Sequence, residues 1–114
     1  MSQRNLLLID DEQALGVLLK RYLERQGHSV EICLDGRQAL RTLNDNPGRF
    51  EVILLDLGLP DISGEELLPQ ILRLAPGSSV LVVSGTPYES ADPRVASLLK
   101  PFTPQMLLEA LAGL

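Results

Sequence analysis

The sequence predicts an α/β domain with a doubly wound, five-stranded parallel sheet, and three observations support this fold class. Short apolar runs alternate along the chain with stretches whose apolar residues recur at helical spacing. Three of these runs are almost unbroken Leu, Ile and Val, as expected for strands covered on both faces. The connections are short, which favours strand–helix–strand crossovers within one sheet. Because no linker or repeat interrupts the pattern, we expect residues 1–114 to form a single domain.

The expected strands are the runs dominated by leucine and β-branched residues. In chain order they are Asn5–Ile9, Val30–Cys33, Val52–Leu55, Val80–Val83 and Val95–Leu99. If their order in the sheet is 2-1-3-4-5, the first and third strands lie side by side. The crevice outside the carboxyl ends of these strands is then the expected ligand site.

Signals for the start or end of a helix flank the stretches of helical spacing. A first helix is expected from about Glu12 to Gln26, with Gly27 as its stop. Asp35, with Gln38 three residues later, provides the N-cap of a second helix.

The third expected helix and the last one both begin at hydroxyl residues. Ser63 and Glu66 form a capping box, and Thr103 followed by Pro104 starts the last helix. Pro69 lies too deep in the third helix to be neutral, so we expect a kink or a later start there.

The segment between Ser84 and Lys100 interrupts the alternation. Its fifteen residues, GTPYESADPRVASLL, contain two prolines, lack an apolar period and must also supply the fifth strand. We therefore expect a shortened or missing fourth helix, with at most one turn near Glu89–Asp92.

Composition excludes several classes of function. The net charge of −5, without a Lys/Arg cluster, argues against a nucleic-acid surface. No apolar run approaches the roughly 18 residues that a membrane span needs, and the start MSQRNLLLID lacks a secretory layout. Cys33 is the single cysteine, so no internal disulfide can form. We expect a cytoplasmic protein that is a monomer or a weak dimer.

Acidic residues follow two of the expected strands. Asp10 and Asp11 end the first strand and Asp56 ends the third, so the three carboxylates meet if these strands are neighbours. Simpler interpretations remain open at this point. Asp11 could be the N-cap of the first helix, Asp10 a loop acid, and Asp56 the start of a turn.

Electrostatics favours a cation at this cluster. Two carboxylates about 4 Å apart repel by roughly 4 kcal/mol at an effective dielectric constant near 20. Three such pairs cost about 12 kcal/mol, which is comparable with the net stability of a domain. Oxygen ligands without a nearby Cys or His favour a hard ion, and Mg²⁺ suits a shallow site that retains water.

Two further side chains are expected at the same edge of the sheet. Ser84 ends the fourth strand and Lys100 follows the fifth. A metal, a hydroxyl and an ammonium group around a carboxylate form a phosphoryl-transfer site, in which Asp56 can be the nucleophile.

With these residues in place, the chain resembles the receiver domain of two-component response regulators. The similarity runs from LLLIDDE through DLGLPDISG and VVSG to KPF. It implies a flavodoxin-like fold, with Asp56 as the phosphoacceptor and Asp10 and Asp11 as the acidic pair. Asp11, Asp56 and the Gly58 carbonyl are then the direct Mg²⁺ ligands.

The resemblance also assigns the remaining site residues and the phosphodonor. Ser84 occupies the Ser/Thr switch position, Lys100 is the phosphate-binding lysine, and Lys100–Pro101 is a cis peptide. The phosphoryl group comes from a phosphohistidine on a sensor histidine kinase or a histidine phosphotransfer protein. Attack by water later returns the domain slowly to its resting state.

The chain departs from the family pattern on its output side. Ser97 replaces the usual Tyr or Phe three residues before the lysine, Gly85 replaces a common Ala, and the fourth helix segment is short. A phosphate relay or sink, as in hybrid-kinase receivers, is therefore an alternative function. We also predict that phosphorylation reshapes the loop from Gly85 to Pro93.

Two other functions remain as alternatives. Haloacid-dehalogenase phosphatases also use a strand-end Asp, but they need an acid two residues later, where this chain has Gly58. A binding module that is never phosphorylated would have little reason to keep a costly acidic cluster. The favoured interpretation is a phosphoacceptor that catalyses only its own phosphorylation and dephosphorylation, and is otherwise no enzyme.

Overall fold

The computed structural model describes residues 3–114 and confirms the predicted fold class. One parallel sheet has the order β2-β1-β3-β4-β5. Its strands are β1 (Asn5–Ile9), β2 (Ser29–Cys33), β3 (Val52–Asp56), β4 (Ser79–Ser84) and β5 (Val95–Leu99). Residues 1 and 2, which the sequence assigns to the same domain, lie outside the described residues.

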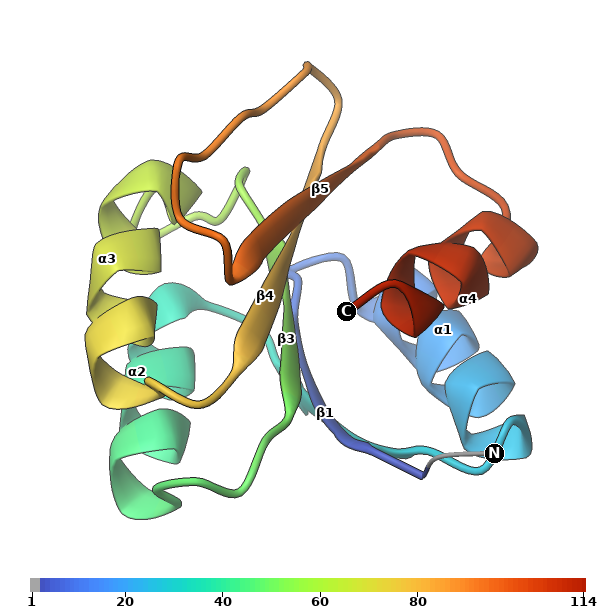
Figure 1. Ribbon diagram of the computed structural model, residues 1–114, viewed down its shortest axis with the longest axis horizontal. Coiled ribbons are helices and arrows are strands. Elements are labelled where there is room, and N and C mark those ends of the chain that lie inside the picture. Colours follow the sequence, from blue (N-terminus) through green and yellow to red (C-terminus); the bar gives the residue numbers. More distant parts are fainter. Residues whose placement is uncertain (1–2) are drawn as a thin grey trace.

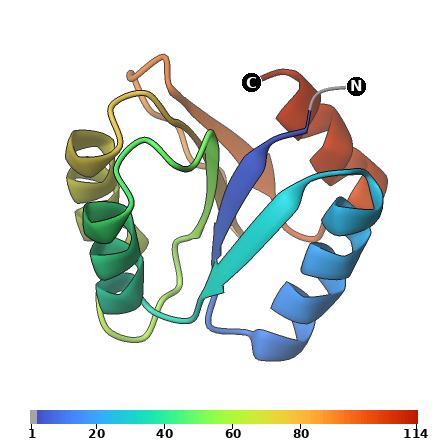
Figure 2. The same cartoon turned by 90° about the horizontal axis from the view of Figure 1, so that it is seen from below.

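Helices cover both faces of the sheet. Within residues 3–114 they are α1 (Gln13–Arg25), α2 (Gly36–Asp45), α3 (Gly64–Leu74) and α4 (Pro104–Ala112). Figure 1 shows α2 and α3 on one side of the sheet and α1 and α4 on the other, and Figure 2 shows the same two layers from below. The arrangement is flavodoxin-like, and β4 and β5 are joined without a helix, which confirms the prediction of a shortened or missing fourth helix. No helix in residues 3–114 has the length and apolar character needed to cross a membrane.

The central strands are buried because both of their faces pack against helices. In β1, Leu6 and Leu8 belong to the core beneath α1 and α4, whereas Leu7 and Ile9 belong to the core beneath α2 and α3. This alternation follows from the two-residue period of a strand. It explains why the sequence shows unbroken apolar runs there, as predicted.

The predicted helix starts are confirmed at three N-caps. Asp35 Oδ1 accepts from the Gln38 N–H at 2.8 Å, and Ser63 Oγ accepts from the Glu66 N–H at 3.2 Å. Thr103 Oγ1 accepts from the N–H of Met106 at 3.1 Å. Each side chain satisfies one of the unpaired donors of a first helical turn.

Of the two effects expected at Pro69, the later start is wrong, while the kink stays a prediction. Helix α3 begins at Gly64 and carries Pro69 inside it. Pro69 removes the N–H that would bond the carbonyl of Glu65, but both residues lie on the exposed side of the helix. Water can bond the Glu65 carbonyl on this exposed side, so the proline does not prevent the helix from starting earlier. The cap at Ser63 sets the start of α3.

Residues 85–94 connect β4 to β5 without a helix, as the two prolines predicted. The turn lies at Pro93–Arg94, beyond the expected Glu89–Asp92, and the Val95 N–H donates to the Asp92 carbonyl at 3.1 Å. Arg94 holds this turn because its Nε and Nη2 contact the two carboxylate oxygens of Asp92 at 3.1 and 2.8 Å. Such paired contacts fix geometry as well as charge.

Arg94 also attaches this connection to α3. Its Nη1 donates to the carbonyls of Leu72 at 3.2 Å and Pro76 at 3.3 Å. The connection is therefore held at the end of α3, although no helix covers β5 on that side. None of the five β5 residues is buried.

One glycine is required by a close approach of the backbone. A Cβ on Gly64 would lie 2.5 Å from the Cα of Leu57, closer than real Cβ atoms approach other heavy atoms. The Gly64 N–H also donates to the Leu57 carbonyl at 3.1 Å. This contact folds the segment after β3 tightly back onto the start of α3.

Candidate functional site

Strand register brings the predicted site residues to one edge of the sheet. Ile9 of β1 pairs with Leu55 of β3, so the next residues, Asp10 and Asp56, lie side by side. Asp56 in turn pairs with Val83 of β4, one residue before Ser84.

The same register places the lysine. Ser84 pairs with Leu99 of β5, and Lys100 follows directly. The acids, the hydroxyl and the ammonium group therefore meet because four parallel strands end together.

The three predicted acids form one cluster. Carboxylate oxygens of Asp10, Asp11 and Asp56 lie within 4.8 Å of one another. Asp10 is only 4% exposed, and its Oδ1 accepts from the Glu12 N–H at 2.9 Å.

The environment of Asp10 opposes its ionisation. The pKa of Asp10 is raised from 3.8 to about 6, first by burial and also by the negative charge of Asp56, although the Glu12 N–H and Lys100 oppose the shift. A cation held between the acids would relieve this strain on the charged form.

Asp56 is fixed through both of its carboxylate oxygens. Its Oδ1 accepts from the Gly58 N–H at 3.0 Å, and its Oδ2 lies 3.4 Å from Lys100 Nζ. The Asp56 side chain is 13% exposed and that of Lys100 is 30% exposed. The carboxylate is thus oriented by the backbone, paired with a cation, and still reachable from solvent.

The hydroxyl of Ser84 is already engaged within its own loop. Ser84 Oγ accepts from the Thr86 N–H at 3.1 Å and lies 3.3 Å from Thr86 Oγ1. Thr86 was not singled out in the sequence. A hydroxyl two residues after Ser84 is the only signal that could have indicated it.

Asp61 is a second residue near the site that sequence reasoning missed. Its Oδ1 accepts from the Gly36 N–H at 2.8 Å and its Oδ2 from the Arg37 N–H at 3.0 Å. Together with Asp35, it caps the start of α2 and ties the loop after β3 to that helix. The hydrogen bond from the Gly36 N–H stabilises the ionised carboxylate and lowers the pKa of Asp61.

The donors present suit a divalent cation. Three carboxylates face one lysine, and all nearby donors are oxygens, which hard cations such as Mg²⁺ prefer. Asp11 is exposed, so an ion there could keep several waters.

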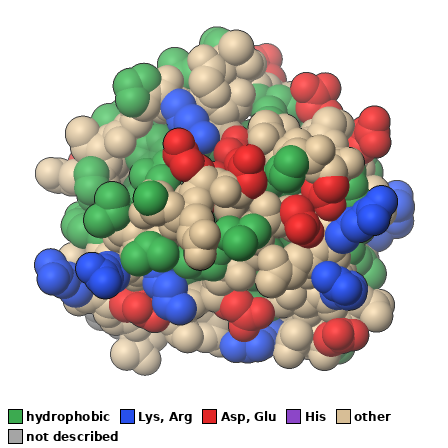
Figure 3. Space-filling view, turned by 180° about the vertical axis from the view of Figure 1, so that it is seen from behind, with side chains coloured by type: hydrophobic (Ala, Val, Ile, Leu, Met, Phe, Trp, Pro, Cys, Tyr) green, Lys and Arg blue, Asp and Glu red, His purple; other side chains and the backbone are tan. Residues whose placement is uncertain are grey.

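In Figure 3, acidic side chains gather mainly toward the upper part of the face shown and basic ones mainly toward its lower part and sides.

Two sequence expectations about neighbouring residues can now be decided. Asp11 does not cap α1, because the N-cap is Glu12 and no side chain bonds the first turn. The Lys100–Pro101 peptide is cis, as the resemblance implied. The role of the Gly58 carbonyl stays a prediction.

Comparison with known proteins agrees with this geometry. The response regulator receiver domain family matches residues 6–112. The transcriptional regulatory protein CreB of Escherichia coli (strain K12) is 34% identical over 114 residues, covering 92% of this chain and 48% of CreB. The chain spans about half the length of the curated relatives it matches first.

Solved structures give the same assignment. A CheY-like receiver domain protein from Methanospirillum hungatei JF-1 superposes with a TM-score of 0.84 at 30% identity, covering 98% of this chain and 93% of the other. The receiver domain of the hybrid histidine kinase CckA has a TM-score of 0.86 at 27% identity, covering 96% of both chains. The chain therefore belongs to the response regulator receiver domain family, the phosphoacceptor domains of two-component signalling.

Proposed function

We propose that residues 1–114 form one cytoplasmic receiver domain in which Asp56 accepts a phosphoryl group from a phosphohistidine. The observation that carries this proposal is the fixed carboxylate of Asp56, held by the Gly58 N–H and Lys100 beside two more acids. The phosphodonor is a sensor histidine kinase or a histidine phosphotransfer protein. The domain catalyses only its own phosphorylation and slow dephosphorylation.

The chemistry follows from the side chains around Asp56. A carboxylate oxygen of Asp56 attacks the phosphorus, an O–P bond forms, and the N–P bond breaks with its electron pair left on the imidazole. The Lys100 ammonium group offsets negative charge on the phosphoryl oxygens, and the Ser84 hydroxyl donates to one of them.

Asp10, Asp11, Asp56 and the Gly58 carbonyl are the groups proposed to hold Mg²⁺. When bound, the ion neutralises charge on the carboxylates and on the transferred phosphoryl group. The Gly58 N–H keeps the Asp56 carboxylate oriented independently of the ion.

Phosphorylation by a small donor tests the proposal. Incubation with Mg²⁺ and acetyl phosphate or phosphoramidate should add one phosphoryl group per chain, measured by intact mass. Asp56→Asn should abolish the addition. Asp45→Asn, which neutralises an exposed acid at the end of α2, should leave it unchanged.

Other outcomes support the alternatives. Repeated turnover on diverse phosphate esters would indicate a phosphatase of the haloacid-dehalogenase type. Folded protein that gains no phosphoryl group from either donor would indicate a binding module that is not phosphorylated.

A phosphate relay or sink is the second candidate function, and the β4–β5 connection favours it. No helix covers β5 on the α3 side, and Ser97 is an exposed residue without an aromatic ring. These are the elements through which receivers commonly report their state, so transfer onward to a histidine is a reasonable output. Rapid return of the phosphoryl group to a histidine phosphotransfer protein would support this function, and a long-lived phosphorylated form would oppose it.

We further propose that phosphorylation reshapes the loop from Gly85 to Pro93. Ser84 Oγ accepts from the Thr86 N–H, and this bond is lost when the hydroxyl turns to the phosphoryl group. Addition of beryllofluoride and Mg²⁺ should therefore shift the amide resonances of Thr86 and the following loop. Shifts confined to residues around Asp56 would contradict this proposal.

A further inference from the structure

The edge strand β5 contains no charged residue of its own, although Glu89 of the preceding loop lines a cavity with Val95, Ala96 and Ser97. β5 is the last strand of the sheet, and its sequence VASLL is uncharged. None of its five residues is buried, and Leu99 is 51% exposed. In Figure 1 this strand lies at the front of the sheet with no helix before it.

The backbone groups on this edge can be assigned from the register. The Val80 N–H donates to the Arg94 carbonyl, and the Lys100 N–H donates to the Ser84 carbonyl. Because backbone groups alternate in direction along a parallel strand, the even-numbered residues of β5 bond to β4. The N–H and C=O groups of Ser97 and Leu99, and the C=O of Val95, therefore point outward.

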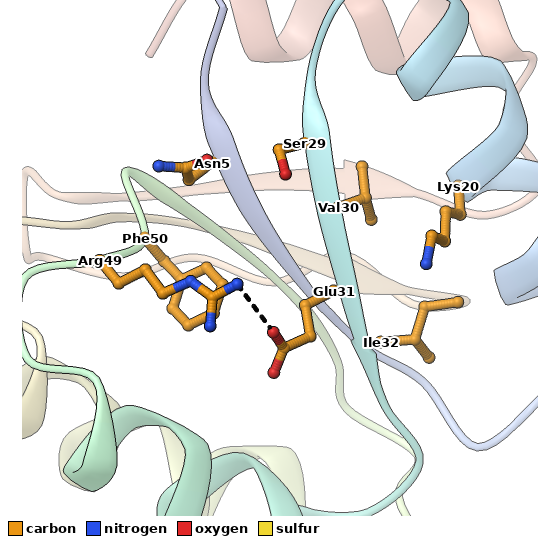
Figure 4. Close-up of a pocket in the computed structure, with 8 residues that line it drawn as sticks. All are labelled: Asn5, Lys20, Ser29, Val30, Glu31, Ile32, Arg49 and Phe50. Atoms are coloured by element: carbon orange, nitrogen blue, oxygen red, sulfur yellow. Dashed lines mark ion pairs between the residues drawn. The ribbon is translucent and has the colours of Figure 1, made fainter.

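The opposite edge of the sheet is protected. There, β2 carries Glu31, which forms an ion pair with Arg49 at 3.1 Å, and Lys20 lies nearby (Figure 4). Charged side chains of this kind discourage pairing with another strand. The two edges of the sheet therefore differ in their readiness to accept a further strand.

We propose that β5 pairs antiparallel with β5 of a second copy of this chain, about a two-fold axis at Ser97. Ser97 then lies opposite Ser97 of the other copy, and the two residues exchange two N–H to C=O bonds. Val95 lies opposite Leu99 of the other copy, and here only the Leu99 N–H donates. The Val95 N–H is already used, since it donates to Asp92 at 3.1 Å.

The side chains also match under this symmetry. Val95, Ser97 and Leu99 point to the sheet face that the missing helix leaves uncovered, because Val95 belongs to the core on that side. The two-fold axis places an apolar Val–Leu pair on each side of the central serines. Cross-strand pairs of this kind stabilise antiparallel strands.

Charge opposes a second copy less at this uncharged strand than at charged regions of the surface. Copies with a net charge of −5 repel one another, and the neutral edge is where they can approach. Arg94 and Lys100 of opposite copies come close in this register. Each is offset by an acid of its own chain, Asp92 at 2.8 Å and Asp56 at 3.4 Å.

Sedimentation equilibrium over a range of concentrations tests this dimer. The wild type should form dimers, and Ser97→Glu should raise the dissociation constant at least about tenfold, because two carboxylates then face each other at the axis. Ser29→Glu makes the same substitution on the exposed start of β2 and should dimerise like the wild type. A monomeric wild type at all concentrations, or equal dimerisation of the Ser97 variant, would overturn the proposal.

Hydrogen exchange on the wild type tests the register without any substitution. The amides of Ser97 and Leu99 should become protected as the concentration rises, whereas those of Ala96 and Leu98 should not change because they already bond to β4. Protection that rises elsewhere while Ser97 and Leu99 still exchange freely would place the interface on another surface. Phosphorylation of Asp56 plays no part in this pairing, so the dimer can form whether or not the domain accepts a phosphoryl group.

Discussion

Strands β3 and β5 have similar apolar sequences and yet different surroundings. In β3 the first four residues are buried, whereas in β5 none is buried. The difference comes from the connections, because β3 lies between two helical layers while residues 85–94 supply only a loop beside β5. Strand sequence sets the potential for burial, and the neighbouring crossover decides whether it is realised.

The same difference makes the acidic cluster rigid and leaves the loop after β4 free to change. The acids stand at the ends of buried strands, so a packed core holds Asp10 and Asp56 in place. The loop that bonds Ser84 has few buried contacts and can change at lower cost. The acidic cluster and the loop proposed to respond to phosphorylation thus differ in local stability.

Truncating one leucine in β3 and one in β5 should give the largest contrast in stability. Leu55→Ala removes a fully buried side chain beside Asp56 and should lower the free energy of unfolding by about 3 kcal/mol. Leu99→Ala acts on a side chain that is 51% exposed and should cost less than about 1 kcal/mol. Urea denaturation measures both, and equal losses would show that β5 is covered in solution.

Magnesium bound at the acidic cluster should stabilise the folded domain at neutral pH. Binding to the folded state at 100 times the dissociation constant adds about 2.7 kcal/mol to the free energy of unfolding. Asp11→Asn should reduce this gain, and Leu99→Ala should retain it. Urea midpoints with Mg²⁺ and with a chelator measure the effect, and an undiminished gain in the Asp11 variant would remove this acid from the cation site.

A smaller effect, of pH on stability, should come from the connection between β4 and β5. The Arg94 side chain lowers the pKa of Asp92 from 3.8 to about 2, so ionised Asp92 favours the folded state. Its contribution is complete above pH 3.8 and is lost as the pH falls toward about 2.

Thermal unfolding over that pH range measures this contribution. Asp92→Asn should lose stability less steeply than the wild type as the pH falls, and Asp45→Asn serves as the exposed control. An unchanged slope would mean that the Asp92–Arg94 pair does not persist in solution.

Sequence reasoning succeeded where one local pattern determines the result. Apolar runs identified the five strands, and Asp56 and Ser84 could be placed together because parallel strands end at a common edge. The caps at Asp35, Ser63 and Thr103 follow from short spacings that the backbone itself imposes. The clustering of the acids was predicted for the same reason, while their individual roles stay predictions.

Contacts between distant segments could not be predicted in this way. Asp61 caps a helix that begins 25 residues earlier, which depends on the path of the loop after β3. The displaced turn at Pro93–Arg94 depends on Arg94 reaching the end of α3. The later start expected at Pro69 was wrong because the effect of a proline depends on which side of the helix faces water.

The close contact between Gly64 and Leu57 has a consequence for anyone who reuses this domain as a scaffold. Gly77 and Gly85 have open space where a methyl group would go, so alanine can replace either of them. Gly64 tolerates no such change, because an added carbon would meet backbone at 2.5 Å and push away the segment that carries the Gly58 N–H. A residue with no reactive atom thereby belongs among the positions to leave untouched when the reactive carboxylate is to be preserved.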